Sequence, residues 1–148
     1  MVHALEEIHR LLKPTGMLID MHPVAEALPV EIHQSGKTDL TGYWSVRQWR
    51  MDYQQADNAL AEITQRGLFA VESEGVFDSL TYYGSAAEMR TSLKEAIDKF
   101  ARDAQSAGGA VPHVQALAAR AEELMQAEAS GAELIIRERV HISRLRPM

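Results

Sequence analysis

The segment from residue 4 to residue 22, ALEEIHRLLKPTGMLIDMH, constrains the fold of this chain most strongly. Apolar residues recur in its first half in steps of three and four, which is typical of one helix face. These residues are Leu5, Ile8, Leu11 and Leu12. Pro14 and Gly16 end that helix. The apolar run GMLIDM follows and stops before Pro23, so we expect a short buried strand at 16–21.

The C-terminal segment AELIIRERVHISRL gives the clearest strand signal, because apolar and polar residues alternate along it. The apolar set is Leu134, Ile136, Val140 and Ile142, and the polar set is Arg137, Arg139, His141 and Ser143. Such alternation is typical of an antiparallel strand with one wet face, or with one face that carries polar contacts. The arginines around Glu138 either bind an anion or form cross-strand pairs, and pairing is the commoner role.

The middle of the chain contains a predicted hairpin, a helix and a long strand. Within 24–50, the turn residues of QSGKTD separate two strand-like stretches, and YWSVRQW belongs to the second of them. A helix is expected at 52–66, with Gly67 just past its end. The stretch LFAVESEGVFDSLTYY predicts a strand at 68–83.

A pair of helices is expected at 85–130. Ser85 and Glu88 have the spacing of a capping box, so they mark the start of the first helix. We expect that helix to break at 108–109, a glycine pair, and the second helix to begin at Pro112. Together the elements predict an α/β or α+β fold: a small mixed sheet with packed helices, a β-hairpin and an inserted helical pair. We expect residues 1–148 to form a single domain.

Charge and composition exclude several classes of function. The formal net charge is −6, so the chain has no broad basic surface to neutralise the phosphates of a nucleic acid. No apolar run is long enough to span a bilayer, and we expect no membrane partner. Cysteine is absent, which excludes disulfides, thiolate metal sites and a cysteine nucleophile, and which fits a cytoplasmic protein.

The helix–turn–strand segment resembles the fifth helix–strand region of class I S-adenosylmethionine-dependent methyltransferases. Members of that family often show the pattern leucine, x, glutamate, isoleucine, x, arginine, x, leucine, lysine, proline, glycine, glycine. The matching residues are Leu5, Glu7, Ile8, Arg10, Leu12, Lys13, Pro14 and Gly16. Thr15 replaces the first glycine. The stretch at 59–72 is similar to the family's last helix and sixth strand, and 132–145 resembles its seventh strand.

This resemblance implies that 132–145 lies centrally in the sheet, antiparallel to the strands at 16–21 and 68–83, with 85–130 as an insertion. It covers the C-terminal half of the family fold only. The family binds its cofactor with a glycine-rich turn after the first strand and an acidic residue after the second. The sequence has no such turn, and the first four strands are absent from it. We therefore expect this chain alone to bind no S-adenosylmethionine.

Two sets of residues are candidates for a substrate pocket. Asp20 and His22 fall at the carboxyl end of the predicted strand at 16–21, where ligands bind in open α/β sheets. The alternative is that Asp20 caps or pairs locally and that His22 belongs to a turn. An aromatic cluster is the second set: Tyr43, Trp44, Trp49 and Tyr53. These side chains either line a pocket or pack in the core or at an interface between chains.

No catalytic residue, cofactor-binding residue or metal site is predicted. His3 and Glu7 have the i, i+4 spacing of a helical metal site, but a zinc site needs a third protein ligand, and a solvated helix face is the better interpretation. No spacing selects one serine as a nucleophile with an adjacent base.

The expected function is that of a methyltransferase-like C-terminal domain without methyl-transfer activity on its own. The chain would be either a truncated gene product or a subunit completed by another chain that supplies the N-terminal half. The alternative is a stand-alone small-molecule-binding or dimerisation module. The strand at 16–21 would have an unpaired edge, and the sheet would lack some of the helices that normally cover its faces. We therefore also expect a homodimer. Its interface would involve the first helix, that strand or the hairpin at 43–53.

Overall fold

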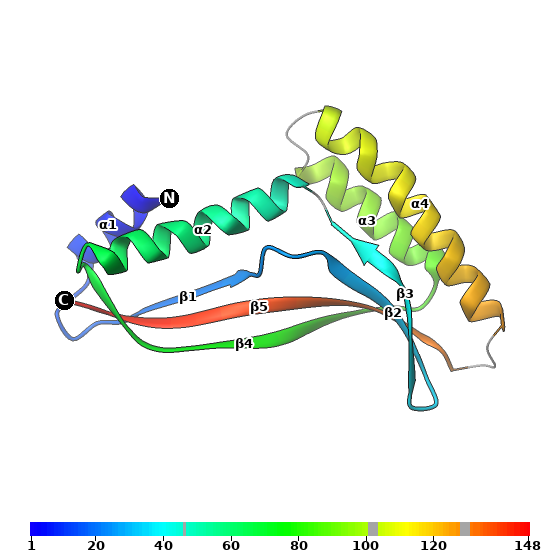
Figure 1. Ribbon diagram of the computed structural model, residues 1–148, viewed down its shortest axis with the longest axis horizontal. Coiled ribbons are helices and arrows are strands. Elements are labelled where there is room, and N and C mark those ends of the chain that lie inside the picture. Colours follow the sequence, from blue (N-terminus) through cyan, green and yellow to red (C-terminus); the bar gives the residue numbers. More distant parts are fainter. Residues whose placement is uncertain (46, 101–103, 128–130) are drawn as a thin grey trace. The chain divides into compact units, whose positions relative to one another are not determined.

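The computed structural model describes residues 1–45, 47–100, 104–127 and 131–148. The elements are α1 (Val2–Leu11), β1 (Leu18–Pro23), β2 (Leu28–Gln34), β3 (Lys37–Trp44), α2 (Arg47–Gln65), β4 (Phe69–Tyr83), α3 (Ala86–Phe100), α4 (Ala104–Ala127) and β5 (Glu133–Pro147). They form a mixed α/β fold, as predicted, and its sheet is antiparallel rather than mixed (Figure 1). None of the helices within these ranges is long and apolar enough to cross a membrane.

The described residues divide into two compact units. Unit 1 contains residues 1–25, 51–78 and 139–148, and unit 2 contains residues 26–50 and 79–138. The strands β4 and β5 each contribute residues to both units. The assignment of the whole chain to a single domain stays a prediction.

Unit 1 is a sheet with helices on one side. The strand β5 pairs antiparallel with β1, from Leu18 opposite Leu145 to Pro23 opposite Val140, and β5 also pairs with β4. The predicted central position of the C-terminal strand is therefore confirmed. The helices α1 and α2 lie on the same side of these strands in Figure 1. Their apolar contacts with the sheet form one core cluster, which contains Leu5, Ala59, Ile63, Phe69 and Leu145.

Unit 2 contains the predicted hairpin. The strands β2 and β3 are joined by Ser35 and Gly36, which both have positive φ values, of 48° and 79°. Two consecutive residues of positive φ are typical of a type I′ hairpin turn, whose twist matches that of the strands. The strand β2 also pairs antiparallel with β5, from Val30 opposite Ile136 to His33 opposite Glu133.

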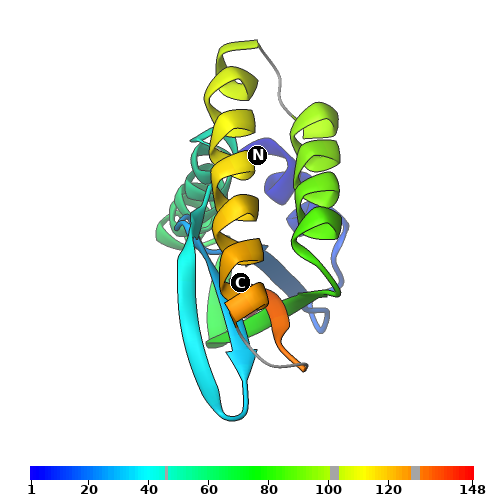
Figure 2. The same cartoon turned by 90° about the vertical axis from the view of Figure 1, so that its right-hand side faces the viewer.

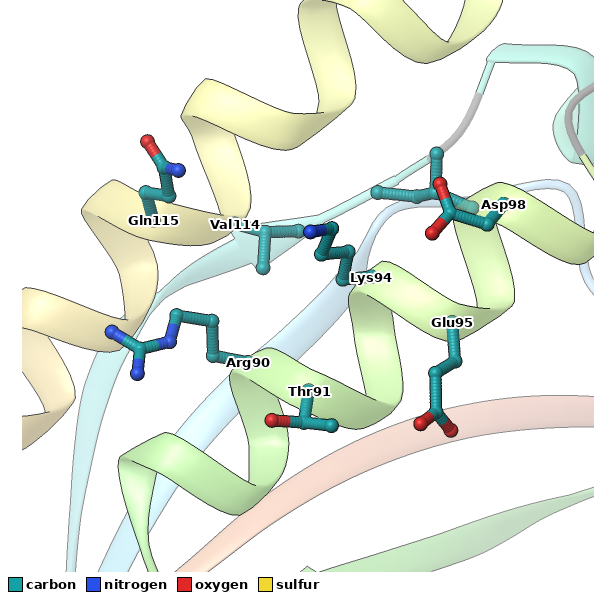
Figure 3. Close-up of a pocket in the computed structure, with 8 residues that line it drawn as sticks. Arg90, Thr91, Lys94, Glu95, Asp98, Val114 and Gln115 are labelled. Atoms are coloured by element: carbon teal, nitrogen blue, oxygen red, sulfur yellow. The ribbon is translucent and has the colours of Figure 1, made fainter.

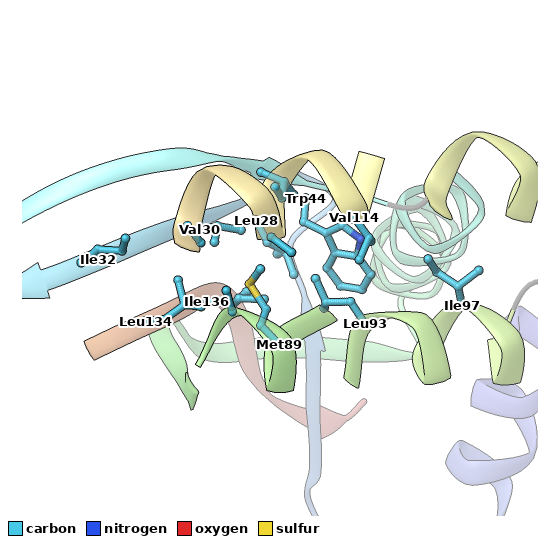
Figure 4. Close-up of a cluster of buried hydrophobic side chains, with 14 residues drawn as sticks. Leu28, Val30, Ile32, Trp44, Met89, Leu93, Ile97, Val114, Leu134 and Ile136 are labelled. Carbon is cyan, nitrogen blue, oxygen red and sulfur yellow. The ribbon is translucent and has the colours of Figure 1, made fainter. Parts of the chain in front are cut away.

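The helices α3 and α4 lie side by side in unit 2 (Figure 2) and share a core with its strands (Figure 4). The fully buried side chains of this core include Val30, Met89, Ile97, Val114 and Leu134. Contributions come from α3, α4 and the strands β2 and β5, so the inserted helical pair is part of the core of this unit. Burying each such side chain stabilises the fold by about 1.5–3 kcal/mol.

Local signals at two helix ends are confirmed. Gly67 lies two residues after Gln65, the last residue of α2. Its φ is 72°, which a glycine adopts at no steric cost. At the start of α3, the Glu88 amide donates to the Ser85 hydroxyl at 3.1 Å. The Glu88 carboxylate accepts in return from the Gly84 amide at 2.8 Å, one residue earlier than in the standard capping box.

Two expectations from the sequence are wrong. The stretch YWSVRQW does not continue as a strand, because β3 ends at Trp44 and α2 begins at Arg47. The helix α4 starts at Ala104 and contains both 108–109 and Pro112. Glycine and proline cost a helix about 1 and 3 kcal/mol. The buried residues Val114, Leu117, Ala118 and Ala121 give α4 a packing free energy that offsets this cost.

The polar face of β5 carries polar contacts, which is the second of the two alternatives for this strand. Ser143 is only 4% exposed, and Leu145, which lies on the same face of the strand, is 1% exposed. This face lies beneath α1 and α2 in unit 1, where Leu145 joins their core cluster. Ser143 is therefore buried on a covered face, and the side chain of His141 on the same face is 25% exposed.

Candidate functional site around His22

His22 lies on β1 with its side chain 10% exposed and both ring nitrogens near carboxylates. Its Nδ1 lies 2.6 Å from Oδ2 of Asp20, and its Nε2 lies 2.9 Å from Oδ1 of Asp57. Asp20 and His22 are two residues apart on a strand, so their side chains share one face of the sheet. Asp57 comes from α2, the helix that covers this face.

The two carboxylates determine the protonation of His22. Burial by itself would lower the pKa of the imidazole, because it disfavours the charged ring. The hydrogen bonds to Asp57 and to Asp20, together with the charges of these two carboxylates, outweigh burial and raise the pKa above its ordinary value. Each ring nitrogen of the protonated form donates to one carboxylate, so the protonated ring fits this arrangement.

His141 is the cross-strand partner of His22 on β5. The two rings meet edge to face, with centroids 5.6 Å apart and an interplanar angle of 67°. The Nδ1 atom of His141 lies 3.5 Å from the Ser143 hydroxyl oxygen. Its Nε2 lies 3.9 Å from a carboxylate oxygen of Glu74. The pairing of β1 with β5 therefore brings two histidines together that are far apart in the sequence.

A cavity of about 370 Å³ adjoins this cluster in unit 1. Its polar lining comes from Asp57, Thr64, Gln65, Glu74, His141 and Ser143. Its apolar lining includes Leu60, Val71 and Leu145. Residues 57, 60, 61 and 64 of α2 line it at helical spacing, so one face of that helix forms a wall. The volume lies in the range of small-ligand sites, which are clefts with a few convergent polar groups.

Of the predicted candidates, Asp20 and His22 therefore come together at one site. Asp57, Glu74 and His141 join them, although sequence reasoning missed all three. His141 and Ser143 were placed in one alternating set, but only the register of β1 against β5 brings His141 to His22. Nothing in the spacing of the helix at 52–66 selects Asp57.

The aromatic candidates lie elsewhere. Trp44 and Trp49 contact each other edge to face in unit 2, with ring centroids 4.9 Å apart, and Trp44 is only 4% exposed within the core. Tyr43 is 53% exposed on β3. Tyr53 is partly buried on α2 in unit 1. Core packing accounts for Trp44, and the pocket role of the other three aromatics stays a prediction.

A second hollow lies between α3 and α4 in unit 2 (Figure 3). Its volume is about 660 Å³, and Arg90, Lys94, Glu95 and Asp98 of α3 line it. These side chains are exposed and carry both signs of charge, as on an ordinary solvated helix face. The hollow therefore selects no charged ligand, and the His22 cluster is the stronger candidate.

The arginines of the C-terminal strand form cross-strand pairs in unit 1. Glu72 of β4 accepts from Arg144 at 2.8 Å and from Arg146 at 2.5 Å. Of the two roles considered for these arginines, pairing is the one observed here.

Comparison of the chain with protein-family models, with curated proteins and with solved structures finds no match.

Proposed function

We propose that this chain is the C-terminal, substrate-side half of a class I methyltransferase-like fold. Residues 1–148 transfer no methyl group by themselves and act together with the cofactor-binding half of the fold. The observation that carries the proposal is the order of strands in unit 1. There, β5 lies between β1 and β4 and runs antiparallel to β1. The resemblance of residues 4–22 to the family implies this order, in which the seventh strand lies between the fifth and the sixth.

The edge of β1 supports the proposal. Among the described residues, β1 is hydrogen-bonded to β5 and ends the strand order. An edge strand carries unpaired backbone donors and acceptors, which are a template for another strand. In a complete fold of this family, the fourth strand occupies that position.

The uncovered face of β1 also supports it. Met17, Ile19 and Met21 are spaced two residues apart, and they are 52%, 50% and 61% exposed. The helices of unit 1 cover the opposite face, where Leu18, Asp20 and His22 lie. Parallel sheets of doubly wound folds have helices on both faces. The cofactor-binding half would therefore supply both the fourth strand beside β1 and the helices that cover this exposed face.

The residues of this chain do not fit S-adenosylmethionine as a cofactor. The family's cradle is a glycine-rich turn between a strand and a helix. The junction between β4 and α3 is a strand–turn–helix, but it contains a single glycine, Gly84. Ser85 and Glu88 already fill the first turn of α3 with their own hydrogen bonds. The cofactor therefore belongs to the half of the fold that residues 1–148 do not supply.

The role of this chain is then to hold the substrate. The cluster around His22 lies at the carboxyl-terminal end of β1, which is where open α/β sheets bind their ligands. Asp57 and His141 line the adjoining cavity, so their polar atoms are available to a small molecule. A neutral or cationic substrate with hydrogen-bond donors fits this lining, because three carboxylates surround the two imidazoles.

A fusion protein tests the proposal. The first four strands and associated helices of a class I methyltransferase are placed before Met1, and S-adenosylmethionine binding is measured by calorimetry. We expect the fusion to bind the cofactor more tightly than either half alone. The same fusion carrying Ile19→Lys and Met21→Lys is the matched control and should lose this gain. Binding by the isolated chain, or a fusion no better than the donor half, would contradict the proposal.

Self-association is the second candidate, and the same exposed residues favour it. Without the supplied half, a second copy of the chain is available to cover Ile19 and Met21. We therefore propose that the isolated chain forms a homodimer through this face and the edge of β1.

A further inference from the structure

We infer that Asp20, His22 and His141 bind a divalent transition-metal ion of the zinc type. This inference rests on the geometry of the cluster alone and does not depend on the methyltransferase resemblance. It adds a metal centre to the cavity in unit 1.

The spacing of the three side chains carries the inference. One nitrogen or oxygen from each of Asp20, His22 and His141 lies within 4.8 Å of the other two. Zinc binds histidine nitrogen and carboxylate oxygen at about 2.0–2.2 Å, so tetrahedral ligands lie roughly 3.4 Å apart. The 2.6 Å between Nδ1 of His22 and Oδ2 of Asp20 is shorter than this distance between zinc ligands. The 4.8 Å within which all three ligand atoms lie is longer than it. Small side-chain rotations therefore bring all three to an ion.

Asp57 orients the first imidazole. Its carboxylate lies 2.9 Å from Nε2 of His22, so Nε2 donates to it and Nδ1 is left on the side of Asp20. A carboxylate that holds the remote nitrogen of a histidine ligand is the usual support of protein zinc sites, because it fixes the tautomer and the ring plane. The ion would take the place of the proton between Nδ1 and Asp20, and that proton would be released to solvent.

The backbone of the site is rigid. His22 and His141 face each other across the antiparallel pair of β1 and β5, and Asp20 is two residues along the same strand. Ligands on paired strands are held more accurately than ligands on loops. The side chain of His22 is 10% exposed, whereas that of His141 is 25% exposed, so the ion would lie at the boundary of the cavity.

The donor set selects the kind of ion. Two imidazoles and one carboxylate suit zinc and its first-row neighbours, whereas Mg²⁺ prefers oxygen ligands alone. The carboxylates of Asp57 and Glu74 add negative charge around the cation. Three protein ligands leave one position open, as in catalytic zinc sites. His141 and Ser143 line the cavity, so the open position would face it.

Zinc titration of the full chain by calorimetry tests this inference, with Mg²⁺ as the control ion. We expect one Zn²⁺ per chain at micromolar affinity and no binding of Mg²⁺. His141→Asn and Asp20→Asn should each weaken zinc binding at least tenfold. Circular dichroism checks that both variants are folded, and they are preferred to a change of the more buried His22. His33→Asn in unit 2 and His3→Asn on α1 are the matched controls and should leave binding unchanged.

Cobalt provides a second readout. The visible absorption of bound Co²⁺ should appear in the native chain and in His33→Asn and disappear in His141→Asn. The inference is overturned if the native chain binds no zinc at micromolar concentration. It is equally overturned if folded His141→Asn and Asp20→Asn bind as the native chain does, or if His3→Asn or His33→Asn abolishes binding.

Discussion

The Nε2 atom of His22 donates to the carboxylate of Asp57 at 2.9 Å, and this bond joins β1 to α2 within unit 1. The side chain of His22 is 10% exposed and that of Asp57 is 42% exposed, so the bond runs from a covered sheet face to the edge of the cavity. It connects residues far apart in the sequence and sets the orientation of the imidazole. The substrate-site and metal-site proposals both depend on that orientation.

Removal of the Asp57 carboxylate should therefore destabilise unit 1. We expect Asp57→Ala to lower the free energy of unfolding by about 1–3 kcal/mol, because a poorly solvated donor is left without its acceptor. Urea unfolding in the presence of a chelator measures this loss without interference from metal. Glu62→Gln, which removes an exposed ion pair between Glu62 of α2 and Arg66 just after that helix, should cost less than about 0.5 kcal/mol. Equal losses in the two variants would show that the bond has no special role.

Close packing at Gly42 should make unit 2 sensitive to a single methyl group. A Cβ added there would lie 2.6 Å from a methyl carbon of Leu117, which is 6% exposed in the core. We expect Gly42→Ala to destabilise the protein by about 1–3 kcal/mol, because Leu117 must move against its neighbours. At Gly75, the added Cβ would meet Ile142 at an ordinary 3.9 Å. Thermal unfolding should show a clear loss for Gly42→Ala and little change for Gly75→Ala.

Glu31 should stabilise unit 2 in a pH-dependent way. Burial would raise the pKa of its carboxyl group, but hydrogen bonds from His33 and Arg137 outweigh burial and lower the pKa. A carboxyl whose pKa is lowered on folding stabilises the protein above its unfolded pKa, near 4.5, and the effect fades as pH falls through the folded pKa. We expect Glu31→Gln to lose about 1–2 kcal/mol at pH 7. Denaturant unfolding should show that the difference in unfolding free energy between the native chain and Glu31→Gln becomes smaller below pH 4.5.

Glu138 should behave in the opposite way. Burial raises the pKa of its carboxyl group, so the charged form is disfavoured in the folded protein. Such a group costs nothing below its unfolded pKa, costs increasingly more stability as the pH rises above that value, and has its full cost above its folded pKa. Glu138→Gln should therefore raise the melting temperature at pH 7 and leave it unchanged near pH 4. A variant less stable than the native chain at pH 7 would contradict this expectation.

Local signals in the sequence were sufficient for much of the fold. The helix before Pro14 and the cap at Ser85 depend on residues within one or two turns, and so does the left-handed Gly67. The same local reasoning failed at 108–109 and Pro112. There, the core around α4 outweighs the poor helix propensity of glycine and proline. This core forms only when the strands β2 and β5 meet the helices, so no local window contains it.

The candidate site could be predicted only in part for the same reason. Asp20 and His22 are two residues apart on one strand, so their shared face follows from the alternation of the strand. Asp57 and His141 reach them through the packing of α2 and through the register that places His22 opposite His141. A slip of that register by one residue would point His141 to the other face of the sheet. Sequence spacing alone therefore could not predict the proposed metal site.

Light scattering at micromolar concentration tests the central claim, that the sheet of unit 1 is incomplete along β1, most directly. We expect the isolated chain to have twice its monomer mass of 16.5 kDa, with an interface of more than about 1,000 Å². The double variant Ile19→Lys and Met21→Lys should be a monomer. Leu40→Lys, an exposed apolar position of unit 2, should leave the dimer intact. A native chain of monomer mass at every concentration would contradict the account, and so would a dimer that survives the double substitution.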